Sequence, residues 1–524
     1  MEIWINDYLR QFHTEYFIRQ TMVIFIIFLF GFFINIVFDT GADNVLKALL
    51  AFPTGISLYV LSGFFLLVFD LGFTAGRIIF LMILTALLLS GVRFLFVRKS
   101  LGTGQGERMI CAVFKDISLK YILIVSSAAL LTALIATLGL FSVSISNDSY
   151  YYFNLYSKAL CRFGILKREY NVFLTDVGLG AVMIGTLPHF FGFNESFGIL
   201  TFFNLDFIAF FFYEAFGYVR ERTGKVSTSL IASFTATLFL LSSMPFIIAS
   251  KWVMANIYFM EYMFICVSLA PRLIRDGRGN GERAENKDMI IFSILFIMLS
   301  LLRMEGTMIS VFLVLVFSTL RFDNRQLALA FVPAVCFQTL YDIRIFILMD
   351  INAPYTFLTE RKAVLQGLMM LFVLVYLLFI RGKIRFTDSN MGGLIIAGLA
   401  AVNVILFIYD RGLYLSNLKV FYENLTDRGG WGAFPVSVIG ILLMILTVGF
   451  YEKRRISLNY FDLVTLGYVI LSVAVSFARG SVLQKSVGDS GNRVLLQAVP
   501  LIVYTLYIHI SDLAVSKEVI SESK

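Results

Sequence analysis

The sequence predicts an all-α integral membrane protein that crosses the bilayer many times. Of its 524 residues, 59% are hydrophobic and 15% are charged, and the mean hydropathy is +0.83. This is far more apolar side chain than one soluble core buries. Apolar stretches close to the ~20 residues that a helix needs to cross the hydrocarbon core recur along the whole chain. We therefore expect one transmembrane domain over residues 1–524 and no separate soluble domain.

Hydropathy places the apolar segments in order and gives about fourteen to sixteen helices. The first, Met22 to Phe38, is too long for the core of a signal peptide and lacks a clear cleavage site, so we expect it to be retained. Val177 to Phe193 contains four glycines and a proline, which makes it the weakest span and a candidate re-entrant segment. The segments cover residues 21–38, 55–74, 76–96, 120–143, 176–192, 197–218, 227–248, 252–270, 288–304, 306–320, 326–348, 363–380, 391–410, 434–451, 459–478 and 494–512.

The distribution of charge predicts how these helices are oriented. The chain has 43 Lys and Arg against 35 Asp and Glu, and the basic residues fall mostly between the apolar segments, as in a membrane protein rather than one that binds nucleic acid. Basic stretches belong to the cytoplasm, which places loops 144–175, 349–362, 411–433 and 479–493 outside. We expect a multi-pass protein of a bacterial plasma membrane. The basic stretches contain Arg98, Lys99, Arg108, Lys115 and Lys120, then Arg272, Arg275, Arg278 and Arg283, then Arg381, Lys383 and Arg385, then Lys453, Arg454 and Arg455.

The outer loop 144–175 contains the carboxylate of greatest interest, Asp148. It lies in the segment Ser146-Asn147-Asp148-Ser149-Tyr150-Tyr151-Tyr152, where an apolar stretch opens into water. A carboxylate at such a mouth can take the proton of an acceptor hydroxyl, or it can cap the helix that follows, and the two roles can coexist. Apolar residues at spacings of three and four between Ser149 and Tyr170 predict an amphipathic helix on the outer interface. This helix could form the wall of a membrane cavity, or it could be an ordinary connector at the interface.

Further charged residues are expected at the outer face. Asp176 suits a helix cap or the binding of an acceptor hydroxyl. Arg303 suits a donor phosphate or a snorkelling position at a helix end. Glu305 lies two positions later at the same helix end, so it should point to a different face of the helix and need not pair with Arg303. Asp342 and Arg344 lie near the outer end of their helix, which makes them candidates for a cavity wall.

The loop from Arg479 to Arg493 is basic on the side where few basic residues are expected. Arg479, Lys485 and Arg493 stand there against Asp489. An anionic ligand such as a lipid phosphate headgroup explains this excess, and a mobile surface loop is the alternative. Arg493 is the second residue, after Asp148, that we expect to act in a site.

Three of these features together resemble the GT-C superfamily, membrane glycosyltransferases that take sugars from polyprenyl-phosphate donors. They are Asp148 opening the first large outer loop, Arg303-Met304-Glu305-Gly306, and Gly491-Asn492-Arg493 with Pro500 after it. The resemblance implies transfer of a sugar to a glycan or lipid-linked acceptor at the outer face, with Asp148 as the catalytic base. It also implies a substrate-binding role for Arg303, Glu305 and Arg493, and from their positions we expect the same role for Asp176, Asp342 and Arg344.

The chain departs from the family pattern at two points. Many members carry two acidic residues in the first loop, whereas here Asn147 precedes a single Asp148, so a divalent metal is left open and no cofactor is assigned. About four apolar segments come before this loop, where many members have one. Other classes also fit: a transporter or flippase that uses Asp206, Glu214, Glu261 and Asp342 as ion or proton sites, and a polymerase or ligase of lipid-linked oligosaccharides that relies on outer arginines.

Overall fold

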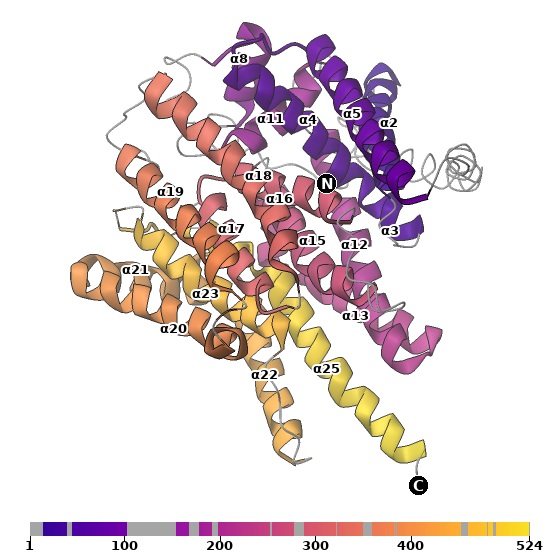
Figure 1. Ribbon diagram of the computed structural model, residues 1–524. Coiled ribbons are helices and arrows are strands. Elements are labelled where there is room, and N and C mark those ends of the chain that lie inside the picture. The colour runs from indigo at the N-terminus through magenta and orange to yellow at the C-terminus, as the bar shows by residue number, and fades with distance from the viewer. Residues whose placement is uncertain are drawn as a thin grey trace.

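The computed structural model is helical throughout the residues that it describes (Figure 1). These are residues 14–38, 44–101, 153–166, 178–190, 197–251, 254–276, 288–320, 322–348, 359–381, 383, 385–451, 459–478, 480, 482–485 and 489–522. The helices are α2 (Thr14–Val37), α3 (Asn44–Leu49), α4 (Ala51–Val68), α5 (Ala75–Leu101), α8 (Leu155–Phe163), α11 (Leu179–Phe190), α12 (Phe197–Thr223), α13 (Val226–Ser242), α14 (Met244–Lys251), α15 (Ala255–Asp276), α16 (Asp288–Leu301), α17 (Gly306–Phe317), α18 (Asn324–Asp342), α19 (Glu360–Val375), α20 (Arg385–Tyr409), α21 (Arg411–Glu423), α22 (Phe434–Tyr451), α23 (Tyr460–Ala478), α24 (Ser490–Leu496) and α25 (Val499–Glu522), with π-helical turns η2 (Ile343–Leu348), η3 (Tyr376–Ile380) and η4 (Asn424–Arg428).

Within the described ranges, nine helices are long and apolar enough to cross a membrane. The number is ten if α13 and α14, which meet at an angle of 69°, form one broken span. Shorter apolar helices, among them α11, α16 and α17, accompany them. The expectation of an all-α multi-pass protein is therefore confirmed. The total of fourteen to sixteen helices stays a prediction, since it includes segments outside the described residues.

The helices divide into buried and outward-facing sets. In Figure 1, α2 to α5 lie on one side of the molecule and α20 to α22 on the other, with α12, α15 and α16 between them. Large apolar side chains stand exposed on the outer helices, among them Ile408 at 74% and Phe450 at 88%. A continuous exposed apolar surface of this kind needs lipid around it. The exposed apolar surface therefore indicates that these helices face lipid.

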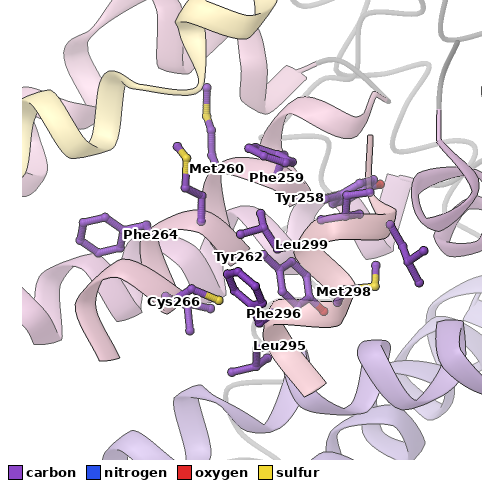
Figure 2. Packing of buried hydrophobic residues seen from close by; sticks show 14 of the residues in the cluster. Tyr258, Phe259, Met260, Tyr262, Phe264, Cys266, Leu295, Phe296, Met298 and Leu299 are labelled. Carbon is purple, nitrogen blue, oxygen red and sulfur yellow. The ribbon is translucent and has the colours of Figure 1, made fainter. Parts of the chain in front are cut away.

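The centre of the bundle is packed with aromatic and aliphatic side chains. Figure 2 shows Tyr262 of α15 near Phe296 and Leu299 of α16, all of them fully buried. Such close packing fixes the relative heights of the helices, because a shift of either one would open voids. It therefore sets where the ends of α15 and α16 lie, and the candidate site is at these ends.

Three expected spans are shorter than the hydrocarbon core. Helix α11, in the weak segment 177–193, has 12 residues and is roughly 18 Å long, against about 30 Å for the core. It fits the expectation that this segment does not cross as an ordinary helix. Helices α16 and α17 have 14 and 12 residues, although both were expected as spans. The turn between them, residues 302–305, is where the Arg-x-Glu-Gly sequence lies.

Part of the expected amphipathic helix in loop 144–175 is present as α8. Tyr156 and Leu160 are buried, while Lys158 and Arg162 are exposed. The hydroxyl of Ser157 donates to the carbonyl oxygen of Val182 over 2.7 Å, which holds α8 against α11. Leu155, expected on the apolar face, is 51% exposed. The position of α8 at a membrane interface stays a prediction.

Candidate functional site

Arg303 lies in the turn between α16 and α17 and is held there by two side chains. Its Nε donates to Oε1 of Glu305 over 2.6 Å, and Nη2 forms an ion pair with the same carboxylate. Its Nη1 donates to Oδ1 of Asn256 over 2.8 Å. The two charged side chains are only 12% and 5% exposed. The expectation that Arg303 and Glu305 need not pair was wrong, because residues 302–305 form a turn and helical spacing does not apply to them.

Gly306 explains why the turn closes after Glu305. Its amide donates to the carbonyl oxygen of Arg303 over 3.0 Å. A Cβ at this position would lie 2.5 Å from the carbonyl oxygen of Ser300, so only glycine fits without a backbone shift. Glycine thus lets α17 begin directly against the end of α16. The glycine of the Arg-x-Glu-Gly sequence fixes the turn that carries the ion pair.

Arg493 reaches the same place from α24. Asp489 caps this helix by accepting from the amides of Gly491 at 2.7 Å and Asn492 at 3.4 Å. The cap directs Arg493 toward the start of α15, where its Nη1 donates to Sδ of Met254 over 3.2 Å. A thioether sulfur is a weak acceptor. Met254 is two residues before Asn256, so the guanidinium groups of Arg303 and Arg493 meet at one short segment, Met254 to Asn256.

A buried amide network connects Arg303 to Met254, the residue that Arg493 contacts, because Nδ2 of Asn256 donates to Sδ of Met254 over 4.0 Å. The Nε2 of Gln497 donates to Oδ1 of Asn256 over 3.5 Å, and the hydroxyl of Tyr468 donates to Oε1 of Gln497 over 2.7 Å. Asn256 and Gln497 are fully buried. Sequence reasoning missed both of them. The signal was present, because an Asn or Gln isolated within an apolar span usually faces the interior of a bundle.

Asn492 connects the cluster to the outer loop 411–433. Its Oδ1 accepts from Nε1 of Trp431 over 2.6 Å, and its Nδ2 donates to the carbonyl oxygen of Gly429 over 3.0 Å. In the motif Gly491-Asn492-Arg493, the Asn therefore anchors α24 and the Arg points into the cluster. The two loops expected on the outer face, 411–433 and 479–493, are in direct contact.

The positive excess of loop 479–493 is smaller than the sequence indicated. Lys485 forms an ion pair with Glu423 at the end of α21. Its charge is thus offset by a carboxylate of the neighbouring loop and does not call for an anionic ligand. Arg479 lies outside the described residues. Arg493 alone carries the phosphate hypothesis for this loop.

Asp342 and Arg344 have other partners. Arg344 forms an ion pair with Asp70, which is in the turn between α4 and α5. Asp342 accepts from Nε2 of Gln338, one turn earlier on α18, over 3.0 Å. Neither contacts Arg303 or Arg493 among the described interactions. The structure therefore brings together Arg303, Glu305 and Arg493, but it does not add Asp342 and Arg344 to them.

The two outer-loop carboxylates, Asp148 and Asp176, lie outside the described residues. The chain does return to the cluster at Gly178, which has φ +80°. A Cβ on Gly178 would lie 2.7 Å from Cα of Arg303, so the backbone at the start of α11 is packed directly on the turn that contains Arg303.

In the described part of the chain, no group of three or more His, Cys, Asp or Glu gathers as metal ligands would.

An apolar groove with a volume of about 590 Å³ runs between α21, η4 and α23 and reaches Leu495 of α24. Ten residues line it, and nine are uncharged; the exception is Lys419. Leu495 is two residues after Arg493, so α24 has the groove near one face and the arginine cluster near another. Nζ of Lys419 is 4.0 Å from Oε1 of Glu423, and the other lining residues give the groove the apolar composition that a lipid tail requires.

Comparisons of this chain with protein-family models, with curated proteins and with solved structures give no match.

Proposed function

We propose that the chain is a membrane glycosyltransferase that moves a sugar from a polyprenyl-phosphate donor to a lipid-linked or cell-surface glycan acceptor at the outer face of the membrane. The observation that carries this proposal is the convergence of Arg303 and Arg493 at the segment from Met254 to Asn256. Guanidinium groups bind phosphate oxygens in a bidentate way. Two of them, brought from distant parts of the chain to one place beside a lipid-facing bundle, suit a lipid phosphate.

The proposed roles follow from the chemistry of transfer. Arg493 binds the donor phosphate and stabilises the charge that develops as the bond between the anomeric carbon and the phosphate oxygen breaks. Arg303 is a positioning residue, because Glu305 and Asn256 already engage it. Asp148 takes the proton of the acceptor hydroxyl as the new glycosidic bond forms. Polyprenyl phosphate leaves, and the configuration at the anomeric carbon is inverted.

The apolar groove beside α24 supports the same proposal. A polyprenyl chain lying along Leu418, Phe421 and Val473 would have its headgroup close to Lys419 of α21 and to α24, which contains Arg493. Burial of the tail in this groove would supply most of the binding free energy, at roughly 25 cal/mol for each Å² of apolar surface. The arginines would then select a phosphate over a neutral headgroup.

The proposal is tested by binding and by transfer, measured separately. The protein is placed in lipid nanodiscs, and binding of a polyprenyl phosphate is compared with binding of the matching polyprenol. We expect Arg493→Ala to weaken binding of the phosphate about tenfold to a hundredfold, the effect of one charge-assisted hydrogen bond. Binding of the polyprenol should be unchanged. Arg325→Ala, which removes an exposed arginine at the start of α18, is the matched control and should change neither.

Transfer is assayed with a panel of polyprenyl-phosphate sugars. Asp148→Asn is expected to retain donor binding and to lose transfer. Full transfer by a folded Asp148→Asn protein would remove Asp148 as the base. Equal binding of phosphate and alcohol by the wild-type protein would remove the arginine cluster as a phosphate site, and with it the proposal.

A further inference from the structure

Two carboxyl groups face each other inside the membrane-spanning bundle, away from the arginine cluster. Asp206 lies on α12 and Glu261 on α15, both within helices long and apolar enough to cross a membrane. Glu261 is completely buried, and neither of its carboxyl oxygens has a hydrogen-bond partner. Oδ2 of Asp206 is likewise enclosed without a partner. The two acids are close enough to act on each other's charge.

Other acids in the bundle are satisfied differently. Glu214, two turns further along α12, forms an ion pair with Arg272 at 3.0 Å. Asp462 on α23 forms an ion pair with His509 at 2.7 Å, and it also caps its helix. Each of these two acids therefore has a basic side chain beside it that stabilises the ionised carboxylate. Asp206 and Glu261 have no such partner among the described residues.

The surroundings of the pair are aromatic. Phe203 of α12 packs on Tyr258 of α15 with ring centroids 4.5 Å apart, and Phe207 packs on Phe264 at 5.8 Å. Figure 2 shows Tyr258, Tyr262 and Phe264 spread along α15 around this level. The hydroxyl of Tyr262 is already used, since it donates to the carbonyl oxygen of Pro53 over 2.6 Å and accepts from Ser57 at 3.1 Å.

The titratable groups that face the pair are therefore few. They are Tyr258 and Tyr262 on α15 and, next to Tyr262, Cys266. All three are neutral near neutral pH, and no described Lys, Arg or His acts on either acid. Within the described part of the chain, no cation therefore offsets a charge on the pair, and a bound cation would do so.

An ionised carboxylate without a partner is very costly in such surroundings, and two facing carboxylates add their mutual repulsion. The cost is removed if a cation is bound between them. The smallest such cation is a proton. A proton on one carboxyl oxygen turns that oxygen into a hydrogen-bond donor, and the facing carboxyl oxygen can then accept from it. We propose that Asp206 and Glu261 form a proton-binding site in the membrane-spanning core, with at least one proton held between the two carboxyl groups at neutral pH. This inference does not depend on the proposed glycosyltransferase activity.

The proton is tested directly by infrared spectroscopy of the protein in nanodiscs, in which a protonated carboxyl group gives a carbonyl band separate from that of a carboxylate. The wild-type protein should show the protonated band at neutral pH. Asp206→Asn and Glu261→Gln, which preserve size and shape, should each remove or shift it. Asp512→Asn is the matched control, because this exposed acid is paired with Arg222, and it should leave the band unchanged.

Thermal unfolding as a function of pH gives a second readout. The folded state holds a proton that the unfolded state releases at neutral pH, so the protein loses stability as pH rises, with up to a tenfold change in the unfolding constant per pH unit for each such proton. Glu261→Gln should flatten this dependence and Asp512→Asn should not.

A wild-type protein with no protonated carboxyl band at neutral pH overturns the proposal, whether or not the variants fold. It is also overturned if the band persists in both amide variants. A third outcome is a band that appears only when sodium is replaced by a large organic cation. That result would show that the pair binds a metal cation in place of the proton.

Discussion

At the scale of residues, partners far apart in the sequence set what each charged side chain does. Arg303 was expected to be independent of Glu305, and it pairs with it because a turn replaces the helix at that point. Arg493 was expected at the end of an outer loop, and it lies in the short helix α24 and contacts the sulfur of Met254 at the start of α15. Lys485 is matched by Glu423. Of the expected site residues, the structure brought together Arg303, Glu305 and Arg493.

The ion pair between Arg303 and Glu305 should stabilise the site. Glu305→Ala leaves a guanidinium that is only 12% exposed without its carboxylate, so we expect the free energy of unfolding to fall by about 3 kcal/mol. The double variant Arg303→Ala/Glu305→Ala should lose less than the sum of the two single changes. Unfolding in detergent by a denaturant measures these values.

Asp512→Ala is the control for this prediction. Its ion pair with Arg222 is 39% and 45% exposed, so its loss should change stability by less than about 1 kcal/mol. Equal effects of Glu305→Ala and Asp512→Ala would contradict a structural role for the buried pair.

At the scale of elements, small residues set how closely helices approach. Helices α2 and α4 cross where Gly31 faces Ala51 and Gly55 faces Ile27. A Cβ on Gly55 would overlap the carbonyl oxygen of Ile27, which is backbone and cannot move aside on its own. Small residues at helix interfaces allow this contact in membranes, where packing rather than the hydrophobic effect holds helices together. The sequence analysis did not identify this crossing, because it depends on which helices become neighbours.

Gly55→Ala should therefore separate α2 from α4. We expect a loss of about 1–3 kcal/mol in the free energy of unfolding, the usual cost of overpacking. Gly398→Ala on α20 is the matched control, since a Cβ there meets nothing within 4 Å, and alanine favours a helix over glycine by about 1 kcal/mol. A melting temperature lowered equally by both substitutions would show that the crossing is not the cause.

At the scale of the whole molecule, the basic segments expected in the cytoplasm lie away from the cluster of Arg303 and Arg493. Arg381, expected in the cytoplasm, donates to the carbonyl oxygens of Phe322 at 2.7 Å and Leu320 at 3.1 Å, so its end of α19 lies beside the start of α18. Arg303 lies just before the start of α17, whereas the carbonyl oxygens that Arg381 contacts follow the end of the same helix. The layout is that expected of a protein whose basic loops are cytoplasmic and whose site is outside. Sidedness itself stays a prediction.

Sidedness can be measured with single cysteines in a background without the four native ones. Gln484→Cys, in the loop before α24, should react with a membrane-impermeant maleimide in intact cells. Arg325→Cys, at the start of α18, should react only after the membrane is opened. Both side chains are exposed, so protection by the protein is not a factor. Reversed labelling would place the arginine cluster in the cytoplasm and end the proposal of an outer-face transferase.

The sequence by itself determined the class of this protein, the helical nature of its described segments and which charged residues were candidates for a site. These follow from composition and local hydropathy, which act on every segment independently. The tertiary structure decided the rest: that Arg303 and Arg493 meet, that Asn256 and Gln497 join them, and that Asp342 and Arg344 do not. It also decided that Asp206 and Glu261 face each other. The physical reason is that a buried polar group is satisfied by whichever helix packs beside it, and long-range packing, not local pattern, chooses that neighbour.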